Sequence, residues 1–198
     1  DVPTSWIAGY VRPDYADASA GTGPDVETLC ARFFQAEGFS DAGIAGALAN
    51  WWAESKFDPA VVEGGGYDLS VIDDVEYSGV GLGQWSRSRR VALFAFAAAM
   101  GRDWRDVDVQ LAYTRAEVAS RGDFQALWAR MATASDPLEA SRDFDAIFEG
   151  SGIKGDRIAA AADFYIKVRS GQYWDGTTAP SPRNPQIDDA RRAVPAYC

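Results

Sequence analysis

One carboxylate, Glu54, stands in a setting suited to general acid catalysis. It follows the adjacent tryptophans Trp51 and Trp52 and precedes Asp58-Pro59, where a helix is expected to end. Apolar neighbours disfavour the charged form of a carboxylate and raise its pKa, as a general acid working near neutral pH requires. The alternative is an ordinary glutamate on the solvated face of a helix, which is the commoner position for this residue type. The residues alone therefore make Glu54 a candidate acid.

The absence of histidine from the 198 residues narrows the chemistry further. Ser-His and Cys-His nucleophiles and His-ligated zinc hydrolysis are excluded within this chain. Carboxylates, tyrosine and lysine remain for proton transfer, and a pair of carboxylates is what glycoside hydrolysis uses. The sequence therefore favours a carboxylate mechanism, and we expect it to need neither a metal nor a cofactor.

The net charge of −10 bears on the partners of the protein. Binding to nucleic acid or to an anionic membrane surface requires clustered lysine and arginine, so neither partner is expected. A neutral or partly cationic polymer, such as a glycan, remains compatible. There is no run of about twenty apolar residues, so no membrane insertion is expected. The chain starts at Asp1 without a basic and apolar leader, which indicates a processed chain or a piece of a longer one.

The elements that position Glu54 are predicted to be helices. Apolar residues recur at helical spacing from Asp25 to Gly171, interrupted by glycine and proline. Helices are expected from Asp25 towards Gly38, from the N-cap Ser40 to Asp58-Pro59, over Arg87–Met100 with Ser86 as N-cap, and over Val107–Ser120, Phe124–Ala134, Pro137–Glu149 and Asp156–Ser170. In the helix that carries Glu54, apolar residues cover much of the circumference and small residues are frequent. This helix is therefore predicted to be central.

The pattern changes after the Glu54 helix. Leu69–Ile72 and Val75–Tyr77 flank Asp73-Asp74, which predicts a short β-hairpin with an acidic tip. The following Gly79–Trp85 segment has glycine at alternating positions, which indicates backbone that passes close to another surface. It lacks the glycine spacing and the lysine of a phosphate-binding loop. The sequence thus predicts a mainly α (α+β) domain with one small β-hairpin insert.

The two ends of the chain differ in composition from the helical part. Residues 1–24 are rich in Pro, Gly, Ala, Ser and Asp and are interpreted as an extended arm. Residues 174–198 carry four prolines and are interpreted as a tail or a linker to a further domain. The folded domain is expected over residues 25–173. The cysteines, Cys30 and Cys198, either form a disulfide, which would suit an extracellular setting, or leave Cys30 as a buried free thiol.

An ordered set of motifs resembles a known family. Glu54-Ser55 is followed by Phe57 and Pro59, then by the short insert, and then by Gly81-Leu82-Gly83-Gln84-Trp85. This order is similar to the phage tail lysozyme group of the lysozyme-like superfamily, and more distantly to goose-type lysozymes and lytic transglycosylases. The resemblance covers roughly residues 25–171. A Glu-Ser pair alone carries little specificity, whereas the ordered set is fairly specific.

The resemblance implies a lysozyme-like helical domain in which Glu54 is the general acid that protonates the glycosidic oxygen. Acidic residues of the insert are candidates for the second catalytic group, and they are Asp68, Asp73, Asp74 and Glu76. Among these we take Asp74, because goose-type enzymes hold an acidic residue shortly before the glycine motif. Those enzymes also have an aspartate after the glutamine, where this chain has Ser86. For each acid the alternative is a solvated turn residue.

Three further residues are predicted to contact the sugar: Tyr77, Gln84 and Trp85. An aromatic ring packs on a sugar face, and an amide recognises hydroxyl and acetamido groups. The alternatives are a core position for Trp85 and a backbone hydrogen bond for Gln84. Glu149 is expected to form a buried ion pair with Arg157 and to hold the last helices together, which is a structural role.

The function that the resemblance implies is hydrolysis of the glycan strand of peptidoglycan, by a muramidase-type enzyme. The expected location is extracellular, at the cell wall or in a virion, with the possibility of further domains in a longer parent chain. Two alternatives remain open. One is a lytic transglycosylase, which leaves anhydro-muramic ends. The other is a non-catalytic module that binds the cell wall and keeps the fold.

Overall fold

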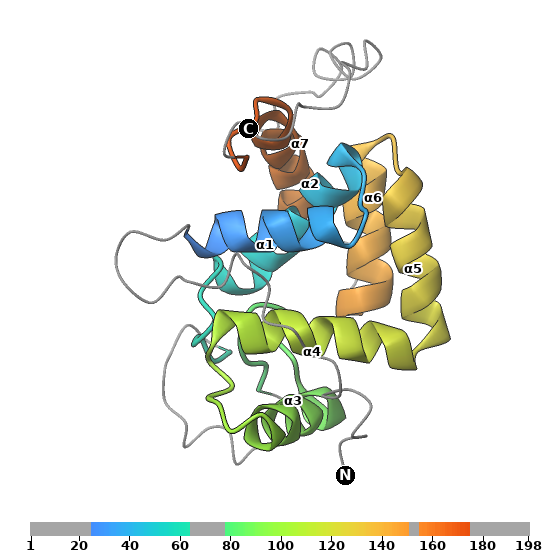
Figure 1. The fold of residues 1–198 in the computed structure, drawn as a ribbon. Helices are drawn as coiled ribbons and strands as arrows, with labels where there is room; N and C mark the ends of the chain where they lie inside the picture. Colours follow the sequence, from blue (N-terminus) through green and yellow to red (C-terminus); the bar gives the residue numbers. More distant parts are fainter. Residues whose placement is uncertain (1–24, 64–77, 151–154, 175–198) are drawn as a thin grey trace.

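The computed structural model describes residues 25–63, 78–150 and 155–174, and this part of the chain is mainly helical, as predicted (Figure 1). The elements are α1 (Val26–Ala36), α2 (Asp41–Ser55), α3 (Arg87–Ala99), α4 (Val107–Ser120), α5 (Gly122–Thr133), α6 (Pro137–Phe144), the π-helical turn η3 (Asp145–Glu149) and α7 (Gly155–Arg169). The bounds of α4 are the predicted ones. The predicted single helix Pro137–Glu149 is instead α6 followed by the wider turn η3.

Helix α2, which carries Glu54, is the central element. It lies against α1, α5, α6 and α7. Helices α5 and α6 run side by side along one edge, and α3 and α4 lie together at the end of the molecule away from α7 (Figure 1). Most residues of α2 are buried, including Ile44, Leu48 and Trp51. The prediction of a central helix is therefore confirmed.

Small residues on α2 let its backbone come close to the backbone of neighbouring helices. A Cβ atom added at Gly46 would lie 2.6 Å from the backbone nitrogen of Ser141 on α6. Two polypeptide backbones can be this close only where one of them has no side chain. Packing rather than helix propensity therefore explains the glycine at position 46, since glycine weakens a helix by about 0.5–1 kcal/mol relative to alanine.

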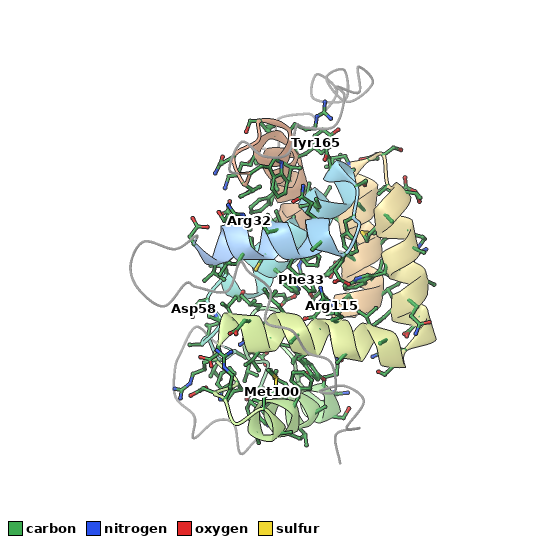
Figure 2. All side chains as sticks on the ribbon, viewed as in Figure 1. Arg32, Phe33, Asp58, Met100, Arg115 and Tyr165 are labelled. Carbon is green, nitrogen blue, oxygen red and sulfur yellow. The ribbon has the colours of Figure 1, made fainter. Side chains whose placement is uncertain are left out.

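The core extends from α1 through α2 into the segment that precedes α3. The ring centroids of Phe34 and Trp51 lie 4.7 Å apart, and those of Trp51 and Trp85 lie 6.4 Å apart. Phe33 of α1 faces α4, where the Arg115 guanidinium lies 5.6 Å from its ring (Figure 2). The aromatic side chains of separate elements thus form one continuous core.

Ser40 begins α2 as predicted. Its Oγ accepts a hydrogen bond from the backbone N–H of Gly43 at 3.0 Å and donates to the carbonyl of Ala134 at 2.7 Å. The hydroxyl therefore caps α2 and also ties its start to the end of α5.

Replacing Ser40 by alanine is expected to lower the free energy of unfolding by about 1 to 2 kcal/mol, because a helix cap is lost and a partly buried carbonyl loses its donor. Urea denaturation followed by circular dichroism measures the change. Ser135→Ala is the matched control, since Ser135 is exposed and an exposed substitution changes stability by at most about 0.5 kcal/mol. Equal stabilities for the two variants would contradict the capping role.

Helix α2 ends at Ser55, before the predicted Asp58-Pro59. Lys56 and Phe57 follow in the left-handed region, with φ angles of 53° and 62°. Ser86 stands at the N-cap of α3 as predicted, but its side chain makes no capping hydrogen bond, so that part of the prediction is wrong.

Of the alternating glycines before α3, Gly81 lies close to another element, at the side chain of Gln110 on α4, whereas Gly79 and Gly83 lie against Gln84 and Trp85 of their own segment. A Cβ at Gly81 would lie 2.6 Å from Gln110 Oε1, and Gly81 has a φ of +69°. Gln110 Oε1 accepts from the N–H of Leu82 at 2.9 Å. Its Nε2 donates to the carbonyls of Pro59 and Trp104 at 2.7 and 2.8 Å. One buried amide from α4 therefore joins three loop segments.

The β structure in the described ranges consists of two isolated antiparallel bridges. Val62 pairs with Val80, and Val80 pairs with Trp85. No longer strand occurs in residues 25–63, 78–150 or 155–174. The predicted hairpin falls on residues 69–77, which lie outside the described residues, as do the predicted arm and all but the first residue of the predicted tail.

Cys30 is a free and fully buried thiol, in agreement with the second of the two readings of the cysteines. Burial raises the pKa of this thiol well above its ordinary value. Cys198 lies outside the described residues. None of the helices in the described ranges is both long enough and apolar enough to span a membrane.

Candidate active site

Glu54 lies in the last turn of α2, and its environment differs from the predicted one. Its Oε1 is hydrogen-bonded to Nη2 of Arg157 from α7, and its side chain is 15% exposed. Trp51 is fully buried in the core, and the half-buried Trp52 ring is covered by the Lys56 ammonium at 3.1 Å from its centroid. The immediate partner of the carboxylate is thus a guanidinium rather than an indole.

Arg157 is itself held in place by buried polar groups. Its Nη1 donates to Asp145 Oδ1 at 2.7 Å and to Asn50 Oδ1 at 3.2 Å. Asn50 in turn donates from Nδ2 to the carbonyl of Ser141 at 3.0 Å. Asn50 and Glu54 lie one turn apart on α2 and both contact Arg157. The planar guanidinium therefore fixes the carboxylate of Glu54 relative to α6, η3 and α7.

The predicted ion pair between Glu149 and Arg157 is wrong, because Glu54 and Asp145 are the carboxylates that pair with Arg157. Glu149 Oε1 is covered and has no hydrogen-bond partner among the described residues. Burial raises the pKa of Glu149 well above its ordinary value, and the charge of Glu54 raises it further, although Arg89 and Arg157 oppose the shift. Glu149 is therefore a half-buried residue with one covered carboxyl oxygen and a raised pKa, and the sequence did not reveal that this oxygen lacks a partner among the described residues.

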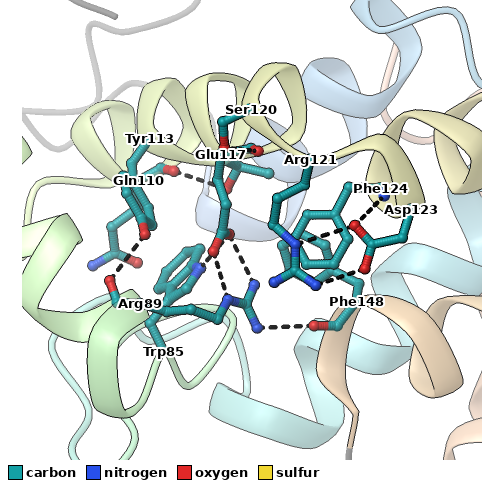
Figure 3. A network of polar contacts seen from close by, with 11 residues as sticks. Trp85, Arg89, Gln110, Tyr113, Glu117, Ser120, Arg121, Asp123, Phe124 and Phe148 are labelled. Carbon is teal, nitrogen blue, oxygen red and sulfur yellow. Dashed lines mark hydrogen bonds and ion pairs between the residues drawn. The ribbon is translucent and has the colours of Figure 1, made fainter. Parts of the chain in front are cut away.

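A second buried network connects α3 and α4 with η3 (Figure 3). Arg89 Nε lies 2.6 Å from Glu117 Oε1, and Arg89 Nη1 donates to the carbonyl of Phe148 at 2.8 Å. Trp85 Nε1 donates to Glu117 Oε2 at 3.2 Å. The network anchors the backbone immediately before Glu149 to the far end of the domain.

Trp85 has no exposed surface. It is a core residue, as the alternative reading of the sequence had it, and a sugar contact is not compatible with this position. Gln84 is half-buried, and its Nε2 donates to the carbonyl of Gly81 at 3.0 Å. Within the described residues, no hydrogen bond joins Gln84 to Glu54.

The remaining predicted site residues lie outside the described residues. They are Tyr77 and the acidic residues of the insert, Asp68, Asp73, Asp74 and Glu76. Over residues 25–63, 78–150 and 155–174, no group of three or more His, Cys, Asp or Glu side chains is arranged to hold a metal ion. The described site contains the carboxyl groups of Glu54, Asp145 and Glu149, and carboxyl groups are able to transfer protons.

A protein-family model matches most of the chain. The family model described as phage tail lysozyme matches residues 25–168, from the N-cap of α1 into the last turn of α7. Comparison with curated proteins gives no match. The family implies a lysozyme-like enzyme that lyses peptidoglycan and is associated with the virion. Because the matched stretch is well over half of the chain, the protein belongs to the phage tail lysozyme family.

Proposed function

We propose that this domain is a peptidoglycan hydrolase of the muramidase type, and that Glu54 is its general acid. The observation that carries the proposal is the way Glu54 is held. A partly exposed carboxylate at the end of the central helix is fixed by Arg157, which is itself buried and bound to Asp145 and Asn50. A general acid must be positioned to within a fraction of an ångström, and rigid supporting residues provide this.

The hydrogen bonds of Glu54 leave one of its oxygens for the substrate. Arg157 contacts Oε1, whereas Oε2 has no hydrogen bond to a described residue. In the proposed reaction, Glu54 carries its proton on Oε2 and donates it to the glycosidic oxygen as the bond from that oxygen to the anomeric carbon breaks. Water then adds to the oxocarbenium-like centre and releases a proton.

The second catalytic group is proposed to be Asp74, on the insert between Glu63 and Ser78. The described stem of this insert supports the proposal, since the N–H of Glu63 donates to the carbonyl of Gly79 at 2.8 Å. The stem starts shortly after the end of α2, so the insert leaves the helical body at the end that bears Glu54. Tyr77 and Gln84 are proposed to contact the sugar. The proposed location is extracellular, at the cell wall or in the virion.

Analysis of the soluble products tests the proposal. Purified sacculi are incubated with the wild-type domain, and the released fragments are examined by mass spectrometry. Muramic acid with a free reducing end is the expected product. Anhydro-muramic ends would instead identify the domain as a lytic transglycosylase. Binding to sacculi without any released fragment would identify it as a wall-binding module.

A further inference from the structure

We propose that Arg89 is a positioning residue for the candidate acid, because it fixes the turn η3 that in turn holds the guanidinium bound to Glu54. Arg89 lies on α3 and forms no hydrogen bond or ion pair with Glu54 in the described ranges, so it acts on the reaction only through these contacts. The inference rests on the proposed role of Glu54 as general acid. It extends the set of residues that orient this acid to the end of the domain away from α7.

The first link is the ion pair that fixes the Arg89 guanidinium on α4. Nε and Nη2 of Arg89 lie 2.6 and 2.9 Å from the two carboxylate oxygens of Glu117, which is buried. Glu117 also accepts a hydrogen bond from Trp85 Nε1 at 3.2 Å (Figure 3). A bidentate pair of this kind fixes both the position and the plane of the guanidinium. Nη1, which the pair does not use, therefore points in a defined direction.

The second link runs from Nη1 to the end of the helical segment that α6 and η3 form. Nη1 donates to the carbonyl of Phe148 at 2.8 Å, one residue before η3 ends at Glu149. The last carbonyl groups of a helix have no partner within the helix, and a cationic side chain that binds them stabilises that end. The Arg89 guanidinium also lies 4.7 Å from the centre of the Phe148 ring. Arg89 thus holds the end of this segment against α3 and α4.

The third link runs through η3 to the site. The turn closes with a 2.8 Å hydrogen bond from the N–H of Gly150 to the carbonyl of Asp145. Asp145 Oδ1 accepts from Arg157 Nη1 at 2.7 Å, and Arg157 Nη2 donates to Glu54 Oε1. Turns of this π-helical type are rare and frequently occur at functional sites. A displacement of the turn therefore moves Asp145 and, with it, the guanidinium that contacts Glu54.

Apolar contacts also hold η3, but they do not orient it in the same way. The Phe148 ring packs against the rings of Phe124, Trp128 and Phe144, with centroids 4.9 to 5.7 Å apart. Hydrophobic packing is non-directional, whereas a hydrogen bond weakens steeply when its angle changes. The bond from Arg89 therefore orients a turn that packing alone would only keep in place.

Arg89→Lys tests the proposal, because lysine keeps the positive charge near Glu117 but lacks the planar fork. Its single nitrogen cannot hold both carboxylate oxygens and the carbonyl of Phe148 in the same fixed geometry. Misplacing a reacting group by about 1 Å can lower a rate by about 10²-fold, so we expect a smaller displacement here to lower kcat about tenfold. KM for soluble glycan fragments should change by less than about twofold, since Arg89 does not bind the substrate in this proposal.

Arg102→Lys is the matched control. Arg102 joins the loop after α3 to α4 through two hydrogen bonds to Asp108, much as Arg89 joins α3 to α4 through Glu117. Among the described residues it has no hydrogen bond to η3. A decrease in melting temperature should therefore appear in both variants, whereas the decrease in kcat should appear only in Arg89→Lys. Equal kcat values for the two variants, at a temperature where both are folded, would overturn the proposal.

Hydrogen exchange at the amide of Gly150 tests the links without any substrate. This N–H is bound to the carbonyl of Asp145, so its exchange requires the turn to open. It should exchange about tenfold faster in Arg89→Lys than in the wild type, and close to the wild-type rate in Arg102→Lys. Equal rates in the two variants refute the link through η3. Full lytic activity of Glu54→Gln instead refutes the proposed function and leaves the exchange result as it is, so the two failures are distinguishable.

Discussion

Replacing Glu54 by glutamine is expected to lower the rate of glycan cleavage by about 10²- to 10⁴-fold, the range that a positioned general acid contributes. The amide can still accept a hydrogen bond from Arg157 at the position of Oε1, but it has no acidic proton to give to the glycosidic oxygen. Release of soluble fragments from purified sacculi, measured at one fixed pH, gives the rate. The loss should persist at all pH values at which the wild type is active.

The fold of Glu54→Gln should be intact, because Asp145 still compensates the charge of Arg157 at 2.7 Å. Far-UV circular dichroism and the melting temperature check this point. The exposed Glu139→Gln serves as the matched control and should keep full activity. A folded Glu54→Gln protein that lyses sacculi at the wild-type rate would remove Glu54 from the mechanism.

Replacing Arg157 by methionine is expected to lower the free energy of unfolding by about 3–5 kcal/mol, the cost of breaking a buried ion pair by removing one partner. Arg157 is 3% exposed, and its loss leaves Asp145 and the amide oxygen of Asn50 without the donor they share. Methionine keeps the unbranched stem of the side chain and lacks the guanidinium, so most of the packing along the stem is retained. Urea denaturation measures the change, since a domain of this size commonly unfolds in one step.

Arg130→Met is the control for this variant, because Arg130 forms an ion pair on the surface. Its side chain is 50% exposed, and its Nε lies 3.5 Å from Asp143 Oδ2. An exposed pair contributes at most about 1 kcal/mol. If Arg157→Met and Arg130→Met lost the same amount, Arg157 would not be the centre of a buried network. In Arg157→Met, lysis should also be slower than in the wild type at a temperature where both are folded, since Glu54 loses the group that orients it.

The sequence was sufficient for the features that local patterns determine. The order of helices follows from apolar periodicity and from glycine and proline punctuation, and the cap at Ser40 follows from its position before an apolar run. The glycines before α3 indicated a close approach of backbone to another surface. The family was also recognised from the order of short motifs, and the family match over residues 25–168 confirms it. The catalytic role of Glu54 stays a prediction.

The partners of the acidic residues were not predictable in the same way. Glu54 and Arg157 are separated by 103 positions in the chain, and only the packing of α7 on α2 brings them together. Periodicity indicates which face of a helix is buried but not which residue of another helix it meets. It therefore could not tell that Arg157 binds Glu54 and Asp145 while Glu149 has no such partner. For the same reason the sequence left open whether Trp85 contacts the sugar or lies in the core, where its indole N–H donates to Glu117.

Glu63 and Gly79 are hydrogen-bonded to each other at the two ends of the insert, and this pairing affects how the length of the insert can change. The N–H of Gly79 donates to Glu63 Oε2 at 2.9 Å, and the neighbouring Val62 and Val80 form a bridge. Because the two ends of the intervening segment are fixed next to each other, doubling its length would cost only about 0.6 kcal/mol of closure entropy. Insertions, deletions or a grafted loop at this position leave Arg157 and its carboxylates untouched. Such a change keeps the contact of Glu54 with Arg157, but it replaces the segment on which Asp74 and Tyr77, the proposed partners of Glu54 at the site, lie.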